Sequence, residues 1–229
     1  MNMPDGKSIR ESAVRFDDPK SARKPEDLFS RGFLRINAWL NRPAASLIVR
    51  ALYRTRVTPN QVTFIAFFMG LAAACFLFTG RPSIVLIGGI LTQVSSIFDC
   101  ADGMLARARD QQSRFGGYLD LFLDRINEFF IMAGYAAGCY RFSGRLSLLV
   151  LGLLGTGLYF LQICLFYLTK NYRQDYRHGE MDETRAALLF LIFLFAATNR
   201  LEAGLYVLAS AAVVANIVHI FSFFRLKRT

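Results

Sequence analysis

The sequence has few of the residues that build disulfide frameworks, zinc sites or histidine-based catalysis. Its 229 residues include only four cysteines and two histidines. The cysteines lie in long apolar segments and lack Cys-x-x-Cys spacing, so we predict neither a disulfide framework nor a thiolate metal site. His178 and His219 are isolated in the sequence, which gives no basis for a zinc site or a Ser-His triad.

Acidic residues are also scarce, at 17 against 27 lysines and arginines, and the formal net charge is +10. A chain this basic is typical either of nucleic-acid binding or of a membrane protein whose charges gather on the cytoplasmic side. Hydrophobic residues make up 54% of the chain and include 22 phenylalanines. This apolar content favours an all-α integral membrane protein, and nucleic acid is not a predicted partner.

Six apolar segments are candidates for membrane spans, because a helix needs about 20 mostly apolar residues to cross about 30 Å of hydrocarbon. The fifth segment is short by this rule. Brief, turn-like joints with glycine, proline or asparagine follow the first, third and fifth segments. The predicted spans are approximately 61–79, 83–106, 115–140, 146–169, 185–198 and 201–224.

The positions of the basic residues predict which side of the membrane each joint faces. Of the 27 lysines and arginines, 22 lie on the side of the two termini, four lie on the opposite side, and Arg125 lies within a span. By the positive-inside rule, this asymmetry places both termini in the cytoplasm. We therefore expect a multi-pass protein of the cell inner membrane, with attraction to anionic lipid as a further effect of the charge.

The N-terminal quarter divides into two parts by composition. Residues 1–26 are polar and charged, so we predict a flexible cytoplasmic tail without a signal peptide. Residues 27–56 mix apolar residues with regularly spaced arginines, which predicts one or two amphipathic helices at the cytoplasmic interface. A soluble helix packed on the bundle is the alternative. Residues 57–229 would then form the six-span domain.

Acidic residues inside the predicted spans carry the functional signal, because ionised groups at that depth are costly unless they are paired, hydrated or bound to cations. Asp99 and Asp102 are spaced i, i+3 near the cytoplasmic end of the second span, and Asp120 and Asp124 are spaced i, i+4 in the third. Each pair therefore occupies one helix face. Since a short return makes these helices antiparallel neighbours, the four carboxylates can face one another across a groove.

Four facing carboxylates would repel one another strongly without cations. Two divalent ions would neutralise them, and oxygen-only ligands favour Mg²⁺ or Mn²⁺ over zinc. Gly103 and Ala106 leave the helix face beside Asp102 nearly bare, and Arg107 adds forked donors suited to phosphate. This combination is typical of phosphoryl transfer by a two-metal site.

The same residues carry a family resemblance. Residues 99–124 match the signature D-x-x-D-G-x-x-A-R-x8-G-x-x-x-D-x-x-x-D of the CDP-alcohol phosphotransferase (CDP-alcohol phosphatidyltransferase) family at all eight fixed positions. The segments 41–43 and 55–63 also resemble, more loosely, the membrane domains of di-myo-inositol-phosphate-phosphate synthases. The resemblance implies six spans after an interfacial helix, and a homodimer.

The resemblance also implies an activity and the residues that serve it. The family transfers a substituted phosphate from a CDP-alcohol to an acceptor alcohol and releases CMP. Asp124 would complete the metal site and act as the base that takes the proton of the acceptor hydroxyl. The implied metal ligands are Asp99, Asp102, Asp120 and Asp124, and the implied nucleotide contacts are Asn60, Thr63, Asp102, Gly103, Ala106, Arg107, Ser113 and Gly116.

Several alternatives stay open at this level. Lys170, Arg173 and Arg177 are either a topology signal or contacts to an acceptor phosphate. Arg125 and Glu128, which lie outside the signature, are predicted to form a structural ion pair. A membrane prenyltransferase or a cation transporter would also place acids within spans. The CDP-alcohol is not defined, since CDP-diacylglycerol and CDP-inositol are both compatible with the signature, and glycerol phosphate, inositol phosphate and serine are all possible acceptors.

Overall fold

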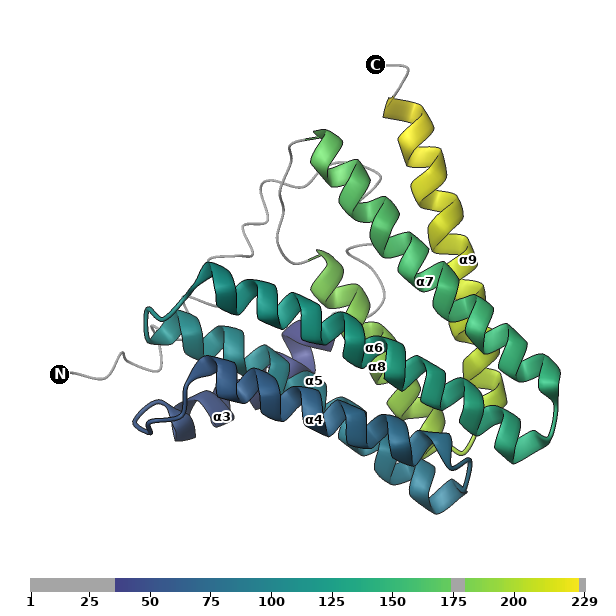
Figure 1. Cartoon of the computed structure of the whole chain (residues 1–229), viewed down its shortest axis with the longest axis horizontal. Helices are drawn as coiled ribbons and strands as arrows, with labels where there is room; N and C mark the ends of the chain where they lie inside the picture. The colour runs from purple at the N-terminus through teal and green to yellow at the C-terminus, as the bar shows by residue number, and fades with distance from the viewer. Residues whose placement is uncertain (1–35, 174–179, 227–229) are drawn as a thin grey trace.

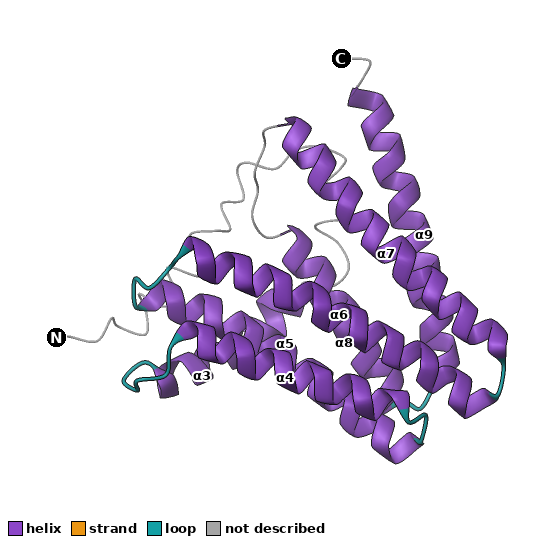
Figure 2. Ribbon diagram, in the orientation of Figure 1, coloured by secondary structure: helices purple, strands orange, loops and turns teal. Residues whose placement is uncertain are grey.

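The computed structural model describes residues 36–173 and 180–226, and all of the regular structure in this part of the chain is helical (Figure 2). Long helices dominate, joined by short turns. The helices are the π-helix η2 (Asn37–Asn41), α3 (Arg42–Leu52), α4 (Pro59–Phe78), α5 (Pro82–Ala108), α6 (Arg114–Ser143), α7 (Leu146–Arg173), α8 (Glu180–Ala197) and α9 (Leu201–Leu226).

The helices form a bundle with two arms (Figure 1). Helix α4 packs against both α5 and α6, and α8 packs on α5. The second arm consists of α7 and α9, which pack on each other and incline away from the first three long helices. The turns α4–α5 and α6–α7 lie at one end of the bundle, and the α5–α6 loop lies at the other. The acidic motif therefore straddles a single loop.

Side-chain caps fix the starts of α4 and α6. The Thr58 side chain accepts a hydrogen bond from the backbone of Gln61, whose side chain accepts one from the backbone of Thr58. This reciprocal pair satisfies two backbone donors at the start of α4. Ser113 is the N-cap of α6, and its Oγ accepts a hydrogen bond from the backbone nitrogen of Gly116 at 2.9 Å.

The largest apolar core lies where α4, α5 and α6 meet α7, α8 and α9. Helices α4 and α6 approach closely there, because a Cβ on Gly138 would lie 2.1 Å from the carbonyl oxygen of Leu77. Only glycine permits that approach. The buried members of this apolar core are Ala74, Leu77, Val85, Ile131, Tyr135, Ala136, Cys139, Leu148, Leu189, Ile192, Ala196, Leu201, Leu205 and Leu208.

Four helices of the described residues are long and apolar enough to cross a membrane, which confirms an all-α membrane protein. They are α4, α5, residues Leu146–Leu168 of α7 and residues Leu201–Val218 of α9. Helix α6 has 30 residues but carries the charged residues of the motif, and α8 has only 18 residues and begins with acidic ones. The predicted count of six crossings therefore remains a prediction.

The N-terminal amphipathic region forms two consecutive helices, η2 and α3, within the described residues. Ala45 and Val49 of α3 are buried against Ala101 and Leu105 of α5, whereas Leu47 on the other face is 65% exposed. The amphipathic character of α3 is thus real, and one face packs on the bundle. Its location at a membrane interface stays a prediction, and residues 27–35 lie outside the described residues.

Candidate active site

Three of the four predicted metal ligands meet between α5 and α6. One carboxylate oxygen from each of Asp99, Asp120 and Asp124 lies within 4.8 Å of the other two. All three residues are half-buried. The helical spacings i, i+3 and i, i+4 place them on facing surfaces of the two helices. The predicted convergence of these acids is therefore present in the folded chain, although three facing carboxylates alone do not define a cation site.

Asp102, the fourth predicted ligand, is more deeply buried and lies beside this group. It is 4% exposed, and its Oδ2 has no hydrogen-bond partner among the described residues. It interacts electrostatically with Asp99 and Asp120 and contacts the side chain of Thr63. A buried carboxylate oxygen without a partner is costly. This donor set, which is made only of oxygens, fits a hard divalent cation such as Mg²⁺ or Mn²⁺.

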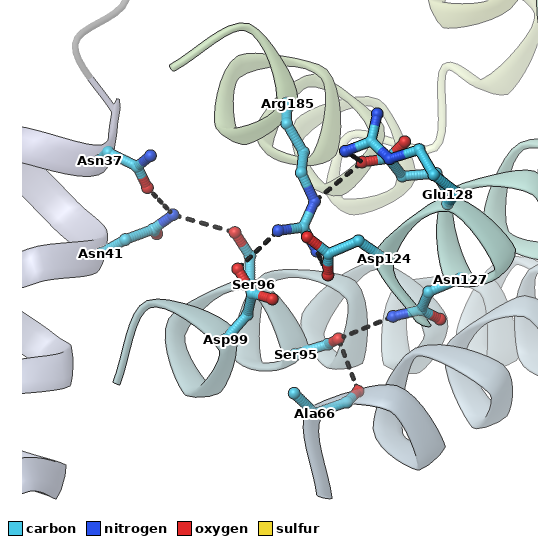
Figure 3. Close-up of polar contacts among 11 residues, drawn as sticks. Asn37, Asn41, Ala66, Ser95, Ser96, Asp99, Asp124, Asn127, Glu128 and Arg185 are labelled. Atoms are coloured by element: carbon cyan, nitrogen blue, oxygen red, sulfur yellow. Dashed lines mark hydrogen bonds and ion pairs between the residues drawn. The ribbon is translucent and has the colours of Figure 1, made fainter. Parts of the chain in front are cut away.

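The structure adds one residue that the sequence pattern missed. Arg185, at the start of α8, points into the acidic group (Figure 3). Its Nη1 lies 2.5 Å from Asp99 Oδ2 and its Nη2 lies 2.6 Å from Asp124 Oδ1. In the sequence, Arg185 had counted only as one of the basic residues of the joint before the fifth span. The acids within the spans do indicate that a nearby positive charge is needed, but they do not indicate which distant residue provides it.

Glu128 extends this network by one helical turn of α6. It is fully buried, and its Oε1 lies 2.9 Å from Arg125 Nη2 and 2.9 Å from Arg185 Nε. The ion pair between Arg125 and Glu128, predicted from their i, i+3 spacing, is therefore present. The additional contact with Arg185 ties that structural pair to Asp99 and Asp124.

The predicted nucleotide contacts fall into two neighbouring groups. A Cβ on Gly116 would lie 3.0 Å from Ser113 Oγ and 3.2 Å from Asn60 Oδ1, so these three residues meet where α4 and α6 begin. On α5, the Arg107 guanidinium lies across Gly103, since a Cβ there would be 3.4 Å from Arg107 Nη1. The spacing had not indicated that the start of α4 joins the start of α6.

Thr63 and Ala106 complete the predicted nucleotide set. Thr63 is buried on α4 and contacts Asp102, and this contact joins α4 to the acidic motif. Ala106 is half-buried on α5, one residue before Arg107. The side chains of Lys170 and Arg173, and the whole of Arg177, lie outside the described residues.

Arg109 holds the chain that leads into α4. Its Nη1 donates to the carbonyl of Val57 at 2.5 Å, and its Nη2 donates to the carbonyls of Tyr53 at 2.9 Å and Thr55 at 3.0 Å. The carbonyl of Leu52 is a further acceptor. These contacts link the end of α5 to the α3–α4 connection.

Buried amide and hydroxyl groups connect η2 to the part of α5 that precedes Asp99. Asn41 is fully buried, its Nδ2 donates to Ser96 Oγ at 2.9 Å, and its Oδ1 accepts from Gln93 Nε2 at 2.7 Å. Ser96 lies three residues before Asp99, on the same side of α5. These hydrogen bonds, drawn in part in Figure 3, anchor η2 to the helix that carries the first acid.

The family model for CDP-alcohol phosphatidyltransferase matches residues 56–223. The match spans most of the chain, and the chain belongs to this family of transferases. The family predicted from the signature is therefore confirmed. Membership also decides against the prenyltransferase and transporter alternatives.

Curated relatives match over less than half of the chain. A bifunctional IPC transferase and DIPP synthase of Thermococcus kodakarensis is 38% identical over 103 residues, which are 44% of this chain and 23% of that protein. An archaetidylinositol phosphate synthase of Pyrococcus horikoshii is 36% identical over 91 residues, which are 40% of this chain and 47% of that protein. The chain thus spans less than half the length of these relatives.

Solved structures match over more of the chain. Phosphatidylinositol phosphate synthase of Mycobacterium tuberculosis with CDP-DAG bound is 23% identical and has a TM-score of 0.62. The match covers 79% of this chain and 92% of that one. The same enzyme in complex with manganese and citrate gives a TM-score of 0.64, again at 23% identity, with 79% and 88% coverage. At this identity, the likeness establishes the fold.

Proposed function

We propose that this protein transfers a substituted phosphate group from a CDP-alcohol to an acceptor alcohol and releases CMP, at the membrane. The observation that carries the proposal is the meeting of Asp99, Asp120 and Asp124 oxygens within 4.8 Å, inside the segment that matches the family model. The oxygen of Asp102 that has no hydrogen-bond partner in the described part of the chain supports it.

Asp99, Asp102, Asp120 and Asp124 would hold two divalent cations, Mg²⁺ or Mn²⁺. When bound, such cations would neutralise the diphosphate and stabilise the charge that builds up during transfer. The manganese complex of the Mycobacterium tuberculosis synthase supports a divalent metal in this fold. The choice of two ions rests on four carboxylates facing a diphosphate.

The nucleotide would lie between the two groups of contacts described above. Asn60, Thr63 and Ser113 offer amide and hydroxyl groups at the starts of α4 and α6. Arg107 offers a guanidinium for phosphate, and it has no ion pair among the described residues. Small residues at 103, 106 and 116 would let the ligand approach the helix backbones.

In the proposed reaction, the acceptor hydroxyl oxygen forms a bond to the β-phosphorus of the CDP-alcohol. The bond from that phosphorus to the oxygen that bridges to the α-phosphorus breaks, and its electron pair leaves with CMP. The Asp124 carboxylate takes the hydroxyl proton. Proximity to cations lowers the basicity of a carboxylate, so this role depends on the placement of the acceptor as much as on proton affinity.

The relatives indicate the substrates to try first. They include an archaetidylinositol phosphate synthase and a phosphatidylinositol phosphate synthase, and one solved structure has CDP-DAG bound. We propose CDP-diacylglycerol with inositol phosphate as the leading pair, with glycerol phosphate or serine as other acceptors and CDP-inositol as another donor. Lys170, Arg173 and Arg177 are proposed to bind the acceptor phosphate.

The same family suggests the membrane arrangement. We propose six crossings by α4 to α9, with η2 and α3 at the cytoplasmic interface and both termini in the cytoplasm. Residues 1–26 would form a flexible tail ahead of the interfacial region 27–56 and the domain 57–229. A homodimer in the cell inner membrane is also proposed. Cysteine accessibility in intact cells at Arg81 and Gln111, in the α4–α5 and α5–α6 connections, would test the sidedness.

A screen of CDP-alcohols against acceptor alcohols, with Mg²⁺ and read by CMP release and product mass, tests the reaction. We expect Asp124→Asn to lower turnover by about 10³-fold while CDP binding partly survives. Asp110→Asn is the matched control, because Asp110 is an exposed acid of the α5–α6 loop outside the cluster. CMP release by Asp124→Asn at the rate of Asp110→Asn would remove Asp124 from the base role.

A further inference from the structure

Arg185 and the proposed cations use the same carboxylate groups. Two of its three carboxylate partners, Asp99 and Asp124, also belong to the group of acids that could hold a metal ion. The third partner, Glu128, lies outside that group. The guanidinium therefore lies where Asp99 and Asp124 face each other, and it binds α8 to both α5 and α6 (Figure 3).

The burial of these groups makes their charge balance important. The side chains of Arg185, Asp99 and Asp124 are only 10%, 17% and 14% exposed, and that of Glu128 is fully buried. Solvent screens such pairs weakly, so a buried carboxylate needs a nearby positive charge. Arg185 provides such a charge for Asp99 and Asp124.

A divalent cation and the guanidinium would compete for the same two carboxylates. Ligand oxygens lie about 2.0 to 2.1 Å from Mg²⁺, and both Asp99 Oδ2 and Asp124 Oδ1 already accept charged hydrogen bonds from Arg185. Like charges at such short range repel strongly in a buried site. We therefore expect cation binding to weaken one or both of these contacts.

Resting on the proposed two-metal function, we propose that Arg185 is an internal counter-ion of the metal site. It pairs with Asp99 and Asp124 in the cation-free protein and withdraws toward Glu128 when cations bind. Arg185 is thus a positioning residue that sets the cation affinity. Glu128 is the residue that keeps the guanidinium inside the protein during the exchange.

Glu128 suits this role because of where it lies. Its Oε1 meets Nε of Arg185, which leaves the two terminal nitrogens of the guanidinium to change partners. The same oxygen meets Arg125 Nη2, so Glu128 is itself held from its own helix. It lies one turn beyond Asp124 on α6 and can retain Arg185 without occupying the metal ligands.

The test is a Mn²⁺ binding isotherm, read from the EPR signal of free Mn²⁺ with purified protein in detergent micelles. Arg185→Lys keeps the charge but cannot bridge two carboxylates, so we expect it to bind Mn²⁺ about tenfold more tightly than the wild type. Arg185→Gln should bind at least as tightly. Glu128→Gln should bind more weakly, because Arg185 then stays on Asp99 and Asp124.

Arg125→Gln is the matched control, since Arg125 contacts Glu128 and forms no ion pair with the metal-site acids in the described part of the chain. We expect its Mn²⁺ affinity to stay within about threefold of the wild type. If Arg185→Gln binds Mn²⁺ more tightly while Arg185→Lys binds it with wild-type affinity, the effect is one of net charge, and the counter-ion role is overturned. Equal Mn²⁺ affinities in all variants would also overturn it. If neither the wild-type protein nor Arg185→Lys binds Mn²⁺, the two-metal function is overturned as well.

Discussion

Two buried regions of this protein are held together by opposite means. The apolar core is built from aliphatic and small residues of six helices together with Tyr135, whose hydroxyl donates to the carbonyl of Leu201 at 3.0 Å. The polar network, at the site, uses charged and amide groups from η2, α5, α6 and α8. Its members are Asn41, Gln93, Ser96, Asp99, Asp124, Glu128 and Arg185.

The difference lies in how each region responds to its surroundings. Apolar packing depends on shape and volume, and neither a cation nor moderate salt alters it. A buried ionic network is stable only when its charges balance, so it responds to any cation that enters. The apolar core therefore holds the helices in register, and the polar network is the part that substrates and metals can rearrange.

The largest expected effect breaks the charge balance of the polar network. Arg185→Met leaves Asp99, Asp124 and Glu128 without their shared cation, and we expect a loss of about 3 to 5 kcal/mol of stability in EDTA. Mg²⁺ should recover part of that loss, because a bound cation stabilises the folded state. Thermal unfolding in micelles with and without Mg²⁺ measures both effects. Equal losses under the two conditions would contradict a shared charge balance.

A change in the apolar core should be nearly as large but indifferent to metal. Leu148 is fully buried, so Leu148→Ala should cost about 3 kcal/mol through lost burial and a residual cavity. The same unfolding assay should give the same loss in EDTA and in Mg²⁺. A loss that Mg²⁺ reverses would show that the two regions are not separable. Leu153→Ala, at a 51% exposed position of the same helix, is the control.

Asn41 allows a change of intermediate size within the polar network. Asn41→Leu removes the partners of Gln93 Nε2 and Ser96 Oγ and should cost about 1 to 3 kcal/mol. The result is read as a lower unfolding midpoint relative to Ser46→Ala, an exposed hydroxyl of α3. Because Ser96 lies one turn before Asp99, we also expect weaker Mn²⁺ binding. A midpoint equal to that of the control would remove Asn41 from the support of the site.

The smallest effect is expected at an ion pair outside both regions. Arg145 Nη2 lies 2.8 Å from Glu202 Oε2, but the two side chains are 59% and 26% exposed. Arg145→Ala should change stability by less than about 1 kcal/mol, because solvent screens such pairs. The difference should shrink further in high salt. A loss comparable to that of Arg185→Met would show that exposure does not separate the two kinds of pair.

Much of the architecture followed from sequence patterns with clear physical causes. Apolar segments of about 20 residues predicted the long helices, and the structure places a helix at every predicted span. The spacing of Asp99, Asp120 and Asp124 predicted their convergence because helix geometry is regular. The signature predicted the family. By contrast, within the described part of the chain four helices, and not six, qualify as spans on length and apolarity alone.

Contacts between distant segments were out of reach, because no local pattern encodes them. Arg185 lies 61 residues after Asp124 and looked like one more basic residue of a joint. Arg109 likewise resembled a topology signal, whereas it holds the carbonyls ahead of α4. No local pattern indicated the buried contacts of Asn41, since its partners on α5 lie more than 50 residues away.

The sequence by itself determined the helices, the membrane class, the acidic motif and the family, because hydrophobic length and helical spacing are local properties. Only the tertiary structure decided which charges meet. The pairing of Arg185 with Asp99, Asp124 and Glu128 depends on how α8 packs against α5 and how both α5 and α6 pack on α4. Electrostatic partners are chosen by distance in the folded chain, and that distance exists only after the apolar faces have packed.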